Sequence, residues 1–308
     1  MVFQQVELHT HRTPFGIRCT DNATQQTIRD GLRLSVLSSA NPGTVVMGAV
    51  TPSGNFGFGR LGIRLPLDLT KPEEDLRDWE YDLSVDFRSL VVNGNPLADK
   101  REFALFCEET QSRFLSCALN VTVDKTNVGT LRSLLLFSAP ARSPIPGLTV
   151  IRGQVKQTVG PAHLPAPYVR IEANYQQNPA PLPTLGISDE RGVFALFLAP
   201  PAPNQFTSGA GTKYAETTAN AILKVGFEPS KQKYLCVAPD NRMESLSGDK
   251  TAELAIKREA GWRCLPDQVS LLSQNSVLSK TVAVALVGET RLTITDNADL
   301  KDSSVWLS

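Results

Sequence analysis

The stretch Ser188-Asp189-Glu190-Arg191-Gly192-Val193-Phe194-Ala195-Leu196-Phe197-Leu198 joins a polar turn to an apolar strand. Acidic residues followed by a glycine are typical of a tight turn. Large apolar residues at alternate positions after Gly192 predict a strand with one buried face. Val169 to Ala173 shows the same alternation upstream. The sequence therefore predicts a β-strand on either side of a turn that glycine closes.

A weaker copy of this pattern lies earlier in the chain. Leu32 to Val36 alternates and is followed by a turn that contains Gly54 and then Phe56. Gly54 aligns with Gly192, and Phe56 with Phe194, at one offset of 138 residues (192 minus 54, and 194 minus 56). A constant offset is the signature of an internal repeat. We therefore expect two related β-domains in tandem.

The composition limits the classes of function that the chain can serve. Its 308 residues suffice for two domains with a core each. Lys and Arg together number 31, as do Asp and Glu, so no overall field attracts nucleic acid or an anionic membrane. No apolar run approaches the roughly 20 residues of a membrane-spanning helix, and the first residues lack the blocks of a secretory signal. We expect a cytoplasmic protein without nucleic-acid partners.

The boundary between the two domains is marked by prolines. Residues 138–147 contain three prolines, which stiffen the chain and remove donors from any β-ladder. The prediction is an N-terminal domain at 1–137, a linker at 138–147 and a C-terminal domain with a tail at 148–308. Two interpretations of the linker stay open: a rigid connector that fixes the placement of the domains, or an ordinary loop between them.

Several strand pairs follow from alternation around polar turns. Phe103 to Cys107 and Phe114 to Val123 are expected to pair antiparallel across the polar residues between them. Val282 to Leu286 alternates and is followed by a Gly-Glu turn, after which Leu292 to Ile294 is expected to pair back. This arrangement predicts a hairpin near the C-terminus.

Three segments are candidates for short helical insertions. In Lys71 to Trp79, a proline and three acids follow the first residue, which suits the positive end of a helix dipole. Tyr214 to Phe227 and Thr251 to Ala260 are rich in helix-forming residues, but the sequence does not decide between helix and strand for either of them.

The five cysteines and three histidines give no strong metal or disulfide signal. An odd cysteine count without a C-x-x-C pair is a poor disulfide framework, so we expect most cysteines to be small buried side chains. His9 and His11 would point the same way from a strand, but no further ligand lies near them, so a structural role is expected. The cysteines are Cys19, Cys107, Cys117, Cys236 and Cys264.

The sequence contains none of the short motifs that carry common enzyme chemistry. Neither phosphate-binding glycine loop occurs, nor does H-E-x-x-H or the nucleophile elbow G-x-S-x-G. Neighbouring acids such as Asp189 and Glu190 would point to opposite faces of a strand. We therefore expect a protein that is not an enzyme, with no catalytic residues, no metal and no cofactor.

Part of the chain resembles a known β-sandwich family. Residues 151–155, 168–173 and 188–198 are similar to the carboxypeptidase regulatory-like domain, a transthyretin-like β-sandwich. The resemblance implies a mainly β fold with two tandem antiparallel β-sandwich domains, transthyretin-like or immunoglobulin-like, and short helical insertions. Because this motif marks a fold more than a function, it implies no activity.

A longer series of motifs resembles a two-domain protein associated with phage-tail-like contractile injection systems. The resemblance implies a non-enzymatic structural component at the baseplate or periphery of the particle. Its partners would be baseplate, sheath or tube subunits, in multiple copies of a symmetric cytoplasmic assembly, and the resemblance does not decide whether that assembly contacts a membrane. The motifs occur in order at residues 30–34, 52–58, 78–80, 112–115, 136–140 and 188–198.

Three aromatic residues on predicted loops and tails are candidate interface anchors, because buried aromatics carry much of the energy of protein interfaces. They are Trp79, Phe206 in the long loop Pro200–Gly211, and Trp306 in the C-terminal tail. Packing within a domain is the competing interpretation for each. The alternative function is a carbohydrate- or peptide-binding β-sandwich module of a surface or secreted system. A hydrolase would need a nucleophile or metal site that the sequence does not reveal.

Overall fold

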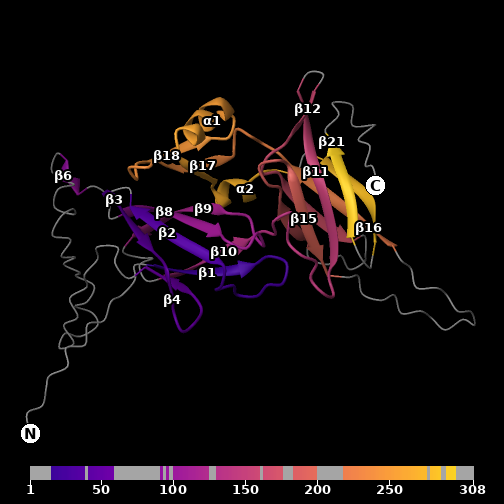
Figure 1. The fold of residues 1–308 in the computed structure, drawn as a ribbon, viewed down its shortest axis with the longest axis horizontal. Coiled ribbons are helices and arrows are strands. Elements are labelled where there is room, and N and C mark those ends of the chain that lie inside the picture. The colour runs from indigo at the N-terminus through magenta and orange to yellow at the C-terminus, as the bar shows by residue number, and fades with distance from the viewer. Residues whose placement is uncertain are drawn as a thin grey trace, which may run out of the picture.

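The computed structural model describes residues 15–38, 41–58, 91–92, 95–96, 100–124, 130–159, 162–175, 183–199, 218–275, 278–285 and 289–295. Within these ranges the protein is mainly β, as the sequence predicts, with two short helices, α1 (Thr251–Glu259) and α2 (Gln268–Leu272). Figure 1 shows two groups of sheets side by side, with a smaller unit that contains both helices lying against the first group.

The first sandwich consists of two four-stranded sheets with the orders β10-β1-β5-β4 and β3-β2-β8-β9. Cys107 lies opposite Cys117 in the antiparallel register of β8 and β9, which confirms the predicted pairing of these two segments. The strands are β1 (Phe15–Asp21), β2 (Leu32–Ser38), β3 (Asn41–Met47), β4 (Ala49–Val50), β5 (Phe56–Gly57), β8 (Lys100–Glu109), β9 (Cys117–Asp124) and β10 (Thr130–Leu136); the short pair β6 (Val91–Val92) and β7 (Asn95–Pro96) is separate.

The core of the first sandwich is formed by alternate residues of its two sheets. The ring of Phe15 in β1 lies 5.3 Å from that of Phe58 and 5.6 Å from that of Phe103, measured between centroids. Leu34 and Val36 of β2 face the same interior, and all five side chains are at most 1% exposed. Full burial of side chains of this size contributes about 1.5–3 kcal/mol each.

The second sandwich has one sheet with the order β12-β11-β15, in which β21 also pairs with β11, and another with the order β14-β13-β16-β20. Phe194 and Leu196 of β15 pack against Ile171 of β13 and Leu223 of β16. The strands are β11 (Thr149–Val159), β12 (Ala162–Pro165), β13 (Arg170–Tyr175), β14 (Thr184–Ile187), β15 (Val193–Leu198), β16 (Thr218–Gly226), β20 (Leu278–Ala285) and β21 (Glu289–Thr295).

The two sandwiches share one topology, which supports the predicted repeat. In the first, β1 pairs antiparallel with β5 and parallel with β10; in the second, β11 pairs antiparallel with β15 and parallel with β21. The order β3-β2-β8-β9 likewise corresponds to β14-β13-β16-β20. Gly54 and Gly192 lie in equivalent turns at φ of 80° and 73°, a left-handed region that favours glycine. Phe56 and Phe194 are buried directly after these turns.

The strand arrangement departs from the prediction in two places. Each sandwich contains one parallel pair, β1 with β10 and β11 with β21, although antiparallel pairing alone was expected. The predicted C-terminal hairpin is wrong, because β20 pairs with β16 in one sheet while β21 pairs with β11 in the other. Alternating residues show that a strand has one buried face, but they do not identify its partner.

The ambiguous segments are now assigned within the described residues. The region of Thr251–Ala260 forms α1, whereas most of Tyr214–Phe227 forms strand β16. Ala221, Leu223 and Val225 of this strand alternate into the core, so tertiary packing overrides the helix propensity of the segment. Residues 214–217 lie outside the described ranges.

An inserted unit separates β16 from β20. It contains the three-stranded sheet β18-β17-β19, with both helices alongside it. Although it belongs to the C-terminal half of the sequence, this sheet packs against the outer face of β3-β2-β8-β9 in the first sandwich, where Phe106 and Ala118 meet Val237. The strands are β17 (Lys233–Val237), β18 (Met243–Ser247) and β19 (Arg263–Pro266).

The turn before β15 predicts a graded response to alanine. A Cβ on Gly192 would lie 2.4 Å from the Val155 carbonyl oxygen, whereas a Cβ on Gly147, at φ of 81°, would meet no atom within 4 Å. We expect G147A to cost about 1 kcal/mol from backbone conformation alone. G192A should cost on the order of 3 kcal/mol, because steric overlap is added. Urea unfolding measures the stability of both variants. Equal losses of stability would show that the close approach of Gly192 to Val155 adds nothing to the cost of the backbone conformation.

Candidate interaction site

The three predicted interface anchors, Trp79, Phe206 and Trp306, all lie outside the described residues, so their role stays a prediction. The same holds for other segments that the sequence singled out: His9, His11, Lys71–Trp79 and Pro200–Gly211. Within the described residues, two features fix the arrangement of the molecule: a buried junction between the sandwiches and a covered disulfide. Two others are surfaces that a partner could contact: a groove and an exposed apolar edge.

The predicted linker packs between the two sandwiches, and Arg142 is its central side chain. Only 9% of Arg142 is exposed. Its guanidinium donates to both carboxylate oxygens of Asp21 at the end of β1, at 2.9 Å and 2.6 Å. It also lies over the ring of Phe114 from the first sandwich, 4.6 Å from the centroid, and over that of Phe197 from the second, at 5.1 Å. One cation therefore contacts both sandwiches.

The carboxylate of Asp21 is held in its ionised form. Burial alone would raise its pKa, but hydrogen bonds from Arg142, from the Thr24 hydroxyl and from the Ala23 backbone N–H outweigh this effect and lower the pKa below its ordinary value of 3.8. A lowered pKa in the folded chain means that the stabilisation is complete above pH 3.8. It is lost as the pH falls through the folded-state pKa.

The second sandwich is hydrogen-bonded to the same linker through Arg152 of β11. The Arg152 guanidinium donates hydrogen bonds to the backbone carbonyl oxygens of Pro140 and Arg142. It also donates to the carboxylate of Glu289 in β21 at 2.9 Å. The linker is thus tied to β1 by one arginine and to β11 and β21 by another, which favours the rigid-connector interpretation.

The inserted unit adds a third tie between the sandwiches. The side-chain amide of Gln268 donates to the backbone carbonyl of Leu135 in β10 at 2.5 Å and accepts from the Leu135 N–H at 3.3 Å. Gln274 donates to the Tyr168 carbonyl of the second sandwich at 3.1 Å. A shared apolar cluster joins all three parts and contains Phe137, Tyr168, Ile187, Tyr234, Cys236, Leu246, Leu254, Cys264 and Leu271.

Replacing Arg142 tests the importance of the junction. We expect R142M to destabilise the protein by about 3 kcal/mol or more, because it leaves the buried Asp21 carboxylate without its cation. The matched control is R242M, which removes a similar 2.7 Å contact to Asp240 from an exposed pair and should change little. Chemical unfolding measures both, and equal effects of the two variants would contradict a structural role for Arg142.

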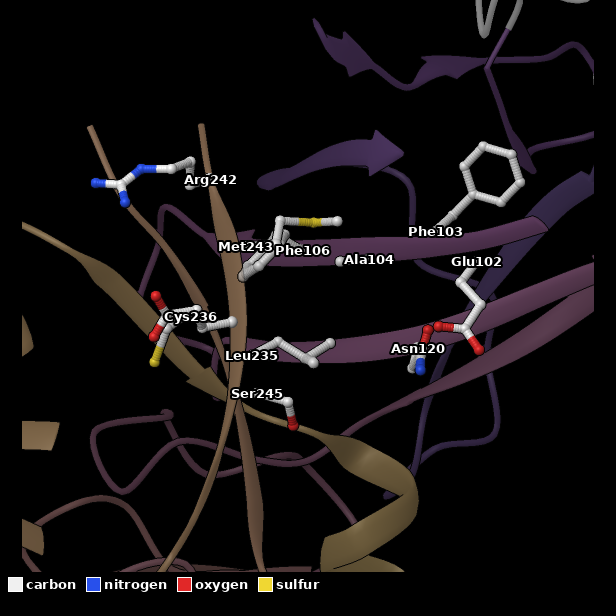
Figure 2. Close-up of a pocket in the computed structure, with 11 residues that line it drawn as sticks. Glu102, Phe103, Ala104, Phe106, Asn120, Leu235, Cys236, Arg242, Met243 and Ser245 are labelled. Atoms are coloured by element: carbon white, nitrogen blue, oxygen red, sulfur yellow. The ribbon is translucent and has the colours of Figure 1, made fainter. Parts of the chain in front are cut away.

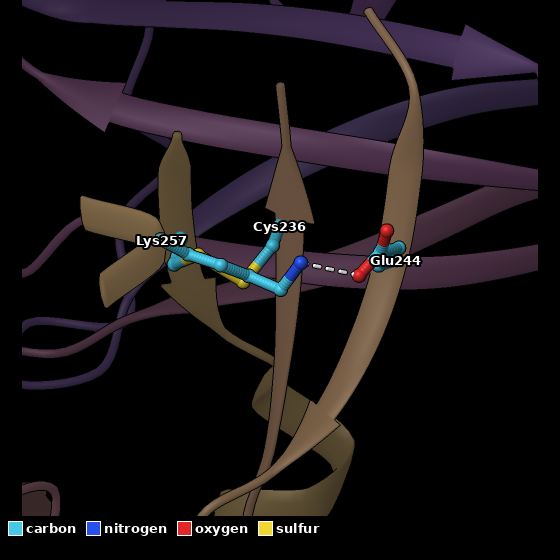
Figure 3. The surroundings of a disulfide bond; sticks show 4 residues. Cys236, Glu244 and Lys257 are labelled. Atoms are coloured by element: carbon cyan, nitrogen blue, oxygen red, sulfur yellow. Dashed lines mark hydrogen bonds and ion pairs between the residues drawn. A yellow bond between two sulfur atoms is a disulfide. The ribbon is translucent and has the colours of Figure 1, made fainter. Parts of the chain in front are cut away.

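The inserted sheet contains a disulfide between Cys236 of β17 and Cys264 of β19, a pair that the sequence did not predict because the cysteine spacing gives a poor disulfide framework. The two residues lie directly opposite each other in the antiparallel register, so their side chains share one face. Figure 3 shows Lys257 of α1 extending across the bond to reach Glu244 of β18, at 2.5 Å. Sequence spacing alone could not reveal this pair, since 28 residues separate its members.

The remaining three cysteines behave as the sequence predicts. Cys19, Cys107 and Cys117 are free thiols, each at most 5% exposed, in the core of the first sandwich. The hydrogen bond with Cys107 and the burial of the site raise the pKa of the Cys117 thiol well above its usual range. Because all three thiols are buried, they serve as small core residues.

The disulfide predicts a definite thiol count. Protein denatured without reductant should expose three reactive thiols per chain, and five after reduction. We expect C236A/C264A to lose about 2–4 kcal/mol of stability, because the bond no longer restricts the unfolded chain. Thiol labelling with mass spectrometry checks the count. Five reactive thiols before reduction would show that the bond is absent.

A groove of about 370 Å³ opens between the first sandwich and the inserted sheet. Figure 2 shows Glu102 and Asn120 at one end, with Phe106, Leu235 and Met243 gathered in the middle. The groove thus has an apolar centre and a polar end. Its walls come from β8 and β9 on one side and from β17 and β18 on the other, as shown by its lining residues: Glu102, Phe103, Ala104, Phe106, Asn120, Leu235, Cys236, Arg242, Met243, Glu244 and Ser245.

A second candidate surface is the edge formed by β3 and β4. These consecutive strands are the terminal members of the two sheets of the first sandwich. Val45, Met47 and Val50 are 39%, 45% and 48% exposed, whereas Val46 points into the core. Among the described residues no strand pairs with the outer side of β3 or β4, and apolar side chains at such an edge are typical of a contact with another chain. The sequence shows these strands but not their position at the edge.

The described residues give no positive sign of catalysis or of a membrane span. Among them, no group of three or more His, Cys, Asp or Glu side chains is placed to hold a metal ion. Neither α1 nor α2 is long and apolar enough to cross a membrane.

Comparison with known proteins identifies no family. No family model matches the chain, and no curated protein matches it. Among solved structures, a 9R-lipoxygenase from Cyanothece PCC8801 is 13% identical over 53% of this chain and 19% of its own, with a TM-score of 0.23. The Bacillus anthracis TIE protein is 7% identical over 93% of this chain and 50% of its own, also at 0.23. This chain thus spans half or less of these structures, and such low scores support no conclusion.

Proposed function

We propose that this protein is a non-enzymatic structural component of a phage-tail-like contractile injection system, at the baseplate or periphery of the particle. The observation that carries the structural role is the junction around Arg142, because it contacts both sandwiches and holds the linker between them. Two sandwiches held in this way present their outer surfaces at a fixed spacing. The choice of an injection particle is supported by the order of the sequence motifs described above.

The surface that would meet a neighbouring subunit is the β3–β4 edge. Val45, Met47 and Val50 offer apolar area there, and edge strands are common sites of strand addition in assemblies. The partners would be baseplate, sheath or tube proteins, with several copies of this chain related by the symmetry of the particle.

The disulfide gives a way to examine the proposed cytoplasmic location. Disulfides persist in oxidising compartments and are rare in the cytosol. A thiol count on protein taken directly from its native host therefore separates the two cases. Reduced Cys236 and Cys264 support a cytoplasmic particle, and an intact bond supports a surface or secreted system.

The second candidate function, a peptide-binding module, is favoured by one observation. The groove beside β18 combines an apolar centre with a polar end, an arrangement that suits alternating side chains of an extended peptide. An assembly protein can also hold a partner in this way, so the groove is compatible with both candidates.

Lysine substitutions at the apolar edge test the assembly role. We expect V45K/M47K/V50K to stay folded, because these side chains are already exposed, but to fail to enter particles in its native host. The control is I256K, which alters a 65% exposed apolar residue of α1, away from that edge. Pull-down with identification of the subunits gives the readout. Normal incorporation of the triple variant would refute the role of this edge, and recovery without any particle subunit would refute the proposed function.

A further inference from the structure

We propose that the β3–β4 edge of the first sandwich binds a second copy of this chain, through the β11–β12 hairpin of that copy. This inference rests on the proposed function and deepens it, since it names the partner that meets the edge. The contact would repeat, between copies, an interface that the structure already contains between its two sandwiches.

The interface inside the chain consists of a docking turn and a receiving edge. The docking turn is formed by residues 21–26 after β1 of the first sandwich. The side-chain amide of Asn22 in this turn donates to the backbone carbonyl of Leu185 in β14. Ala23 packs against an apolar cluster that contains Ala195 of β15. The receiving edge therefore belongs to the second sandwich, where β14 is the terminal strand of its sheet.

The first sandwich contains a counterpart of this receiving edge. Leu185 in β14 lies opposite Glu172 of β13. Met47 in β3 lies opposite Ser35 of β2 in the same way. Met47 and Leu185 are 138 residues apart (185 minus 47), which is the offset of the internal repeat. Met47 is therefore the counterpart of Leu185, and the β3–β4 edge is the counterpart of the receiving edge.

This counterpart edge is open among the described residues. The Gly48 N–H donates to the Leu34 carbonyl. Because hydrogen bonding in an antiparallel pair alternates, Met47 directs its N–H and C=O groups away from β2. Neither group has a partner among the described residues, whereas Asn22 occupies the carbonyl of Leu185. Met47 is also 45% exposed, whereas Leu185 is packed against the apolar cluster that joins the sandwiches to the inserted unit.

The second sandwich contains a counterpart of the docking turn. At the base of that turn, the Ile28 N–H donates to the Cys19 carbonyl. The Ala166 N–H donates to the Val155 carbonyl at the equivalent place in the second sandwich. Residues 157–164 of the β11–β12 hairpin therefore correspond to the docking turn. The hairpin is two residues longer (166 minus 155, against 28 minus 19).

The hairpin is available for a contact outside the chain. All four residues of β12 are exposed, and Leu164 is 46% exposed. β15 pairs with β11 only as far as Gln154, whereas β12 pairs with residues 156–159, so the hairpin extends beyond β15. Figure 1 shows the hairpin and the β3–β4 edge far apart in the molecule. Only another copy can therefore bring a hairpin to this edge.

The result would be a head-to-tail contact. Leu164 of one copy would lie against Met47 and Val45 of the next, so that exposed apolar side chains cover each other. Because the contact joins two different surfaces, each pair of copies leaves one hairpin and one edge unused. Further copies can then add until a ring closes or a filament forms.

Sedimentation velocity of the full-length protein over a range of concentrations tests this contact. We expect the wild type to associate as its concentration rises. L164K and M47K should each weaken this association about tenfold or more, because a lysine charge would enter the contact. The control is I256K, which alters a 65% exposed residue of α1 and should associate as the wild type does. Unfolding curves confirm that all three variants are folded.

Mixing the two variants separates a head-to-tail contact from a symmetric one. L164K keeps its edge and M47K keeps its hairpin, so the mixture should form dimers but no larger species. If two edges paired with each other instead, L164K alone would associate as the wild type does. That result, a mixture without dimers or a monomeric wild type would overturn the inference.

Failure of this inference can be distinguished from failure of the proposed function. If the wild type is monomeric while V45K/M47K/V50K is still excluded from particles, the edge binds another subunit and only this inference falls. If copies associate head to tail but a pull-down recovers no particle subunit, the proposed function falls and this inference stands.

Discussion

The buried ion pair between Asp21 and Arg142 is the interaction on which the arrangement of the molecule depends. Removing two charges from water is costly, and the cost is offset only where the charges are well matched and their remaining hydrogen-bonding groups are satisfied. Asp21 meets this condition, since it accepts from Arg142, Thr24 and the backbone of Ala23. Because Arg142 also packs on Phe197, the pair holds the linker between the two sandwiches.

Because of the inserted unit, the junction also affects the groove and not only the placement of the two sandwiches. The unit is inserted between two strands of the second sandwich, yet its sheet covers the outer face of β2, β8 and β9 in the first. Strand β8 is therefore buried on both faces, which explains why Phe103 to Cys107 form a continuous apolar run without alternation. The groove lies where this covering ends, at β18. A displacement of the sandwiches would therefore change the groove as well as the spacing of the outer surfaces.

Much of the fold could be predicted from local patterns. The repeat could be predicted from the turns at Gly54 and Gly192 and from the alternating strands around them. A positive φ favours glycine, and a strand with one buried face alternates apolar and polar residues, so both features are visible in the local sequence. The partners of β20 and β21 could not be predicted, since alternation does not say which sheet a strand joins. Sequence also could not pair Cys236 with Cys264, which come together only through the register of β17 and β19.

The candidate site was harder to predict than the fold. The predicted aromatic anchors lie outside the described residues, whereas the junction depends on Arg142, a charged residue within a segment rich in proline. The sequence gives no signal for this role, because an arginine is equally common in a linker exposed to solvent.

The central claim is that the buried pair holds the two sandwiches at one fixed distance. The most direct measurement places spin labels on the exposed residues Ser53 and His163 after their replacement by cysteine, and records the distance distribution between them; the native free cysteines are buried. A single narrow distance that broadens in R142M is the result predicted here. A broad distribution in the protein with Arg142 intact would contradict the account.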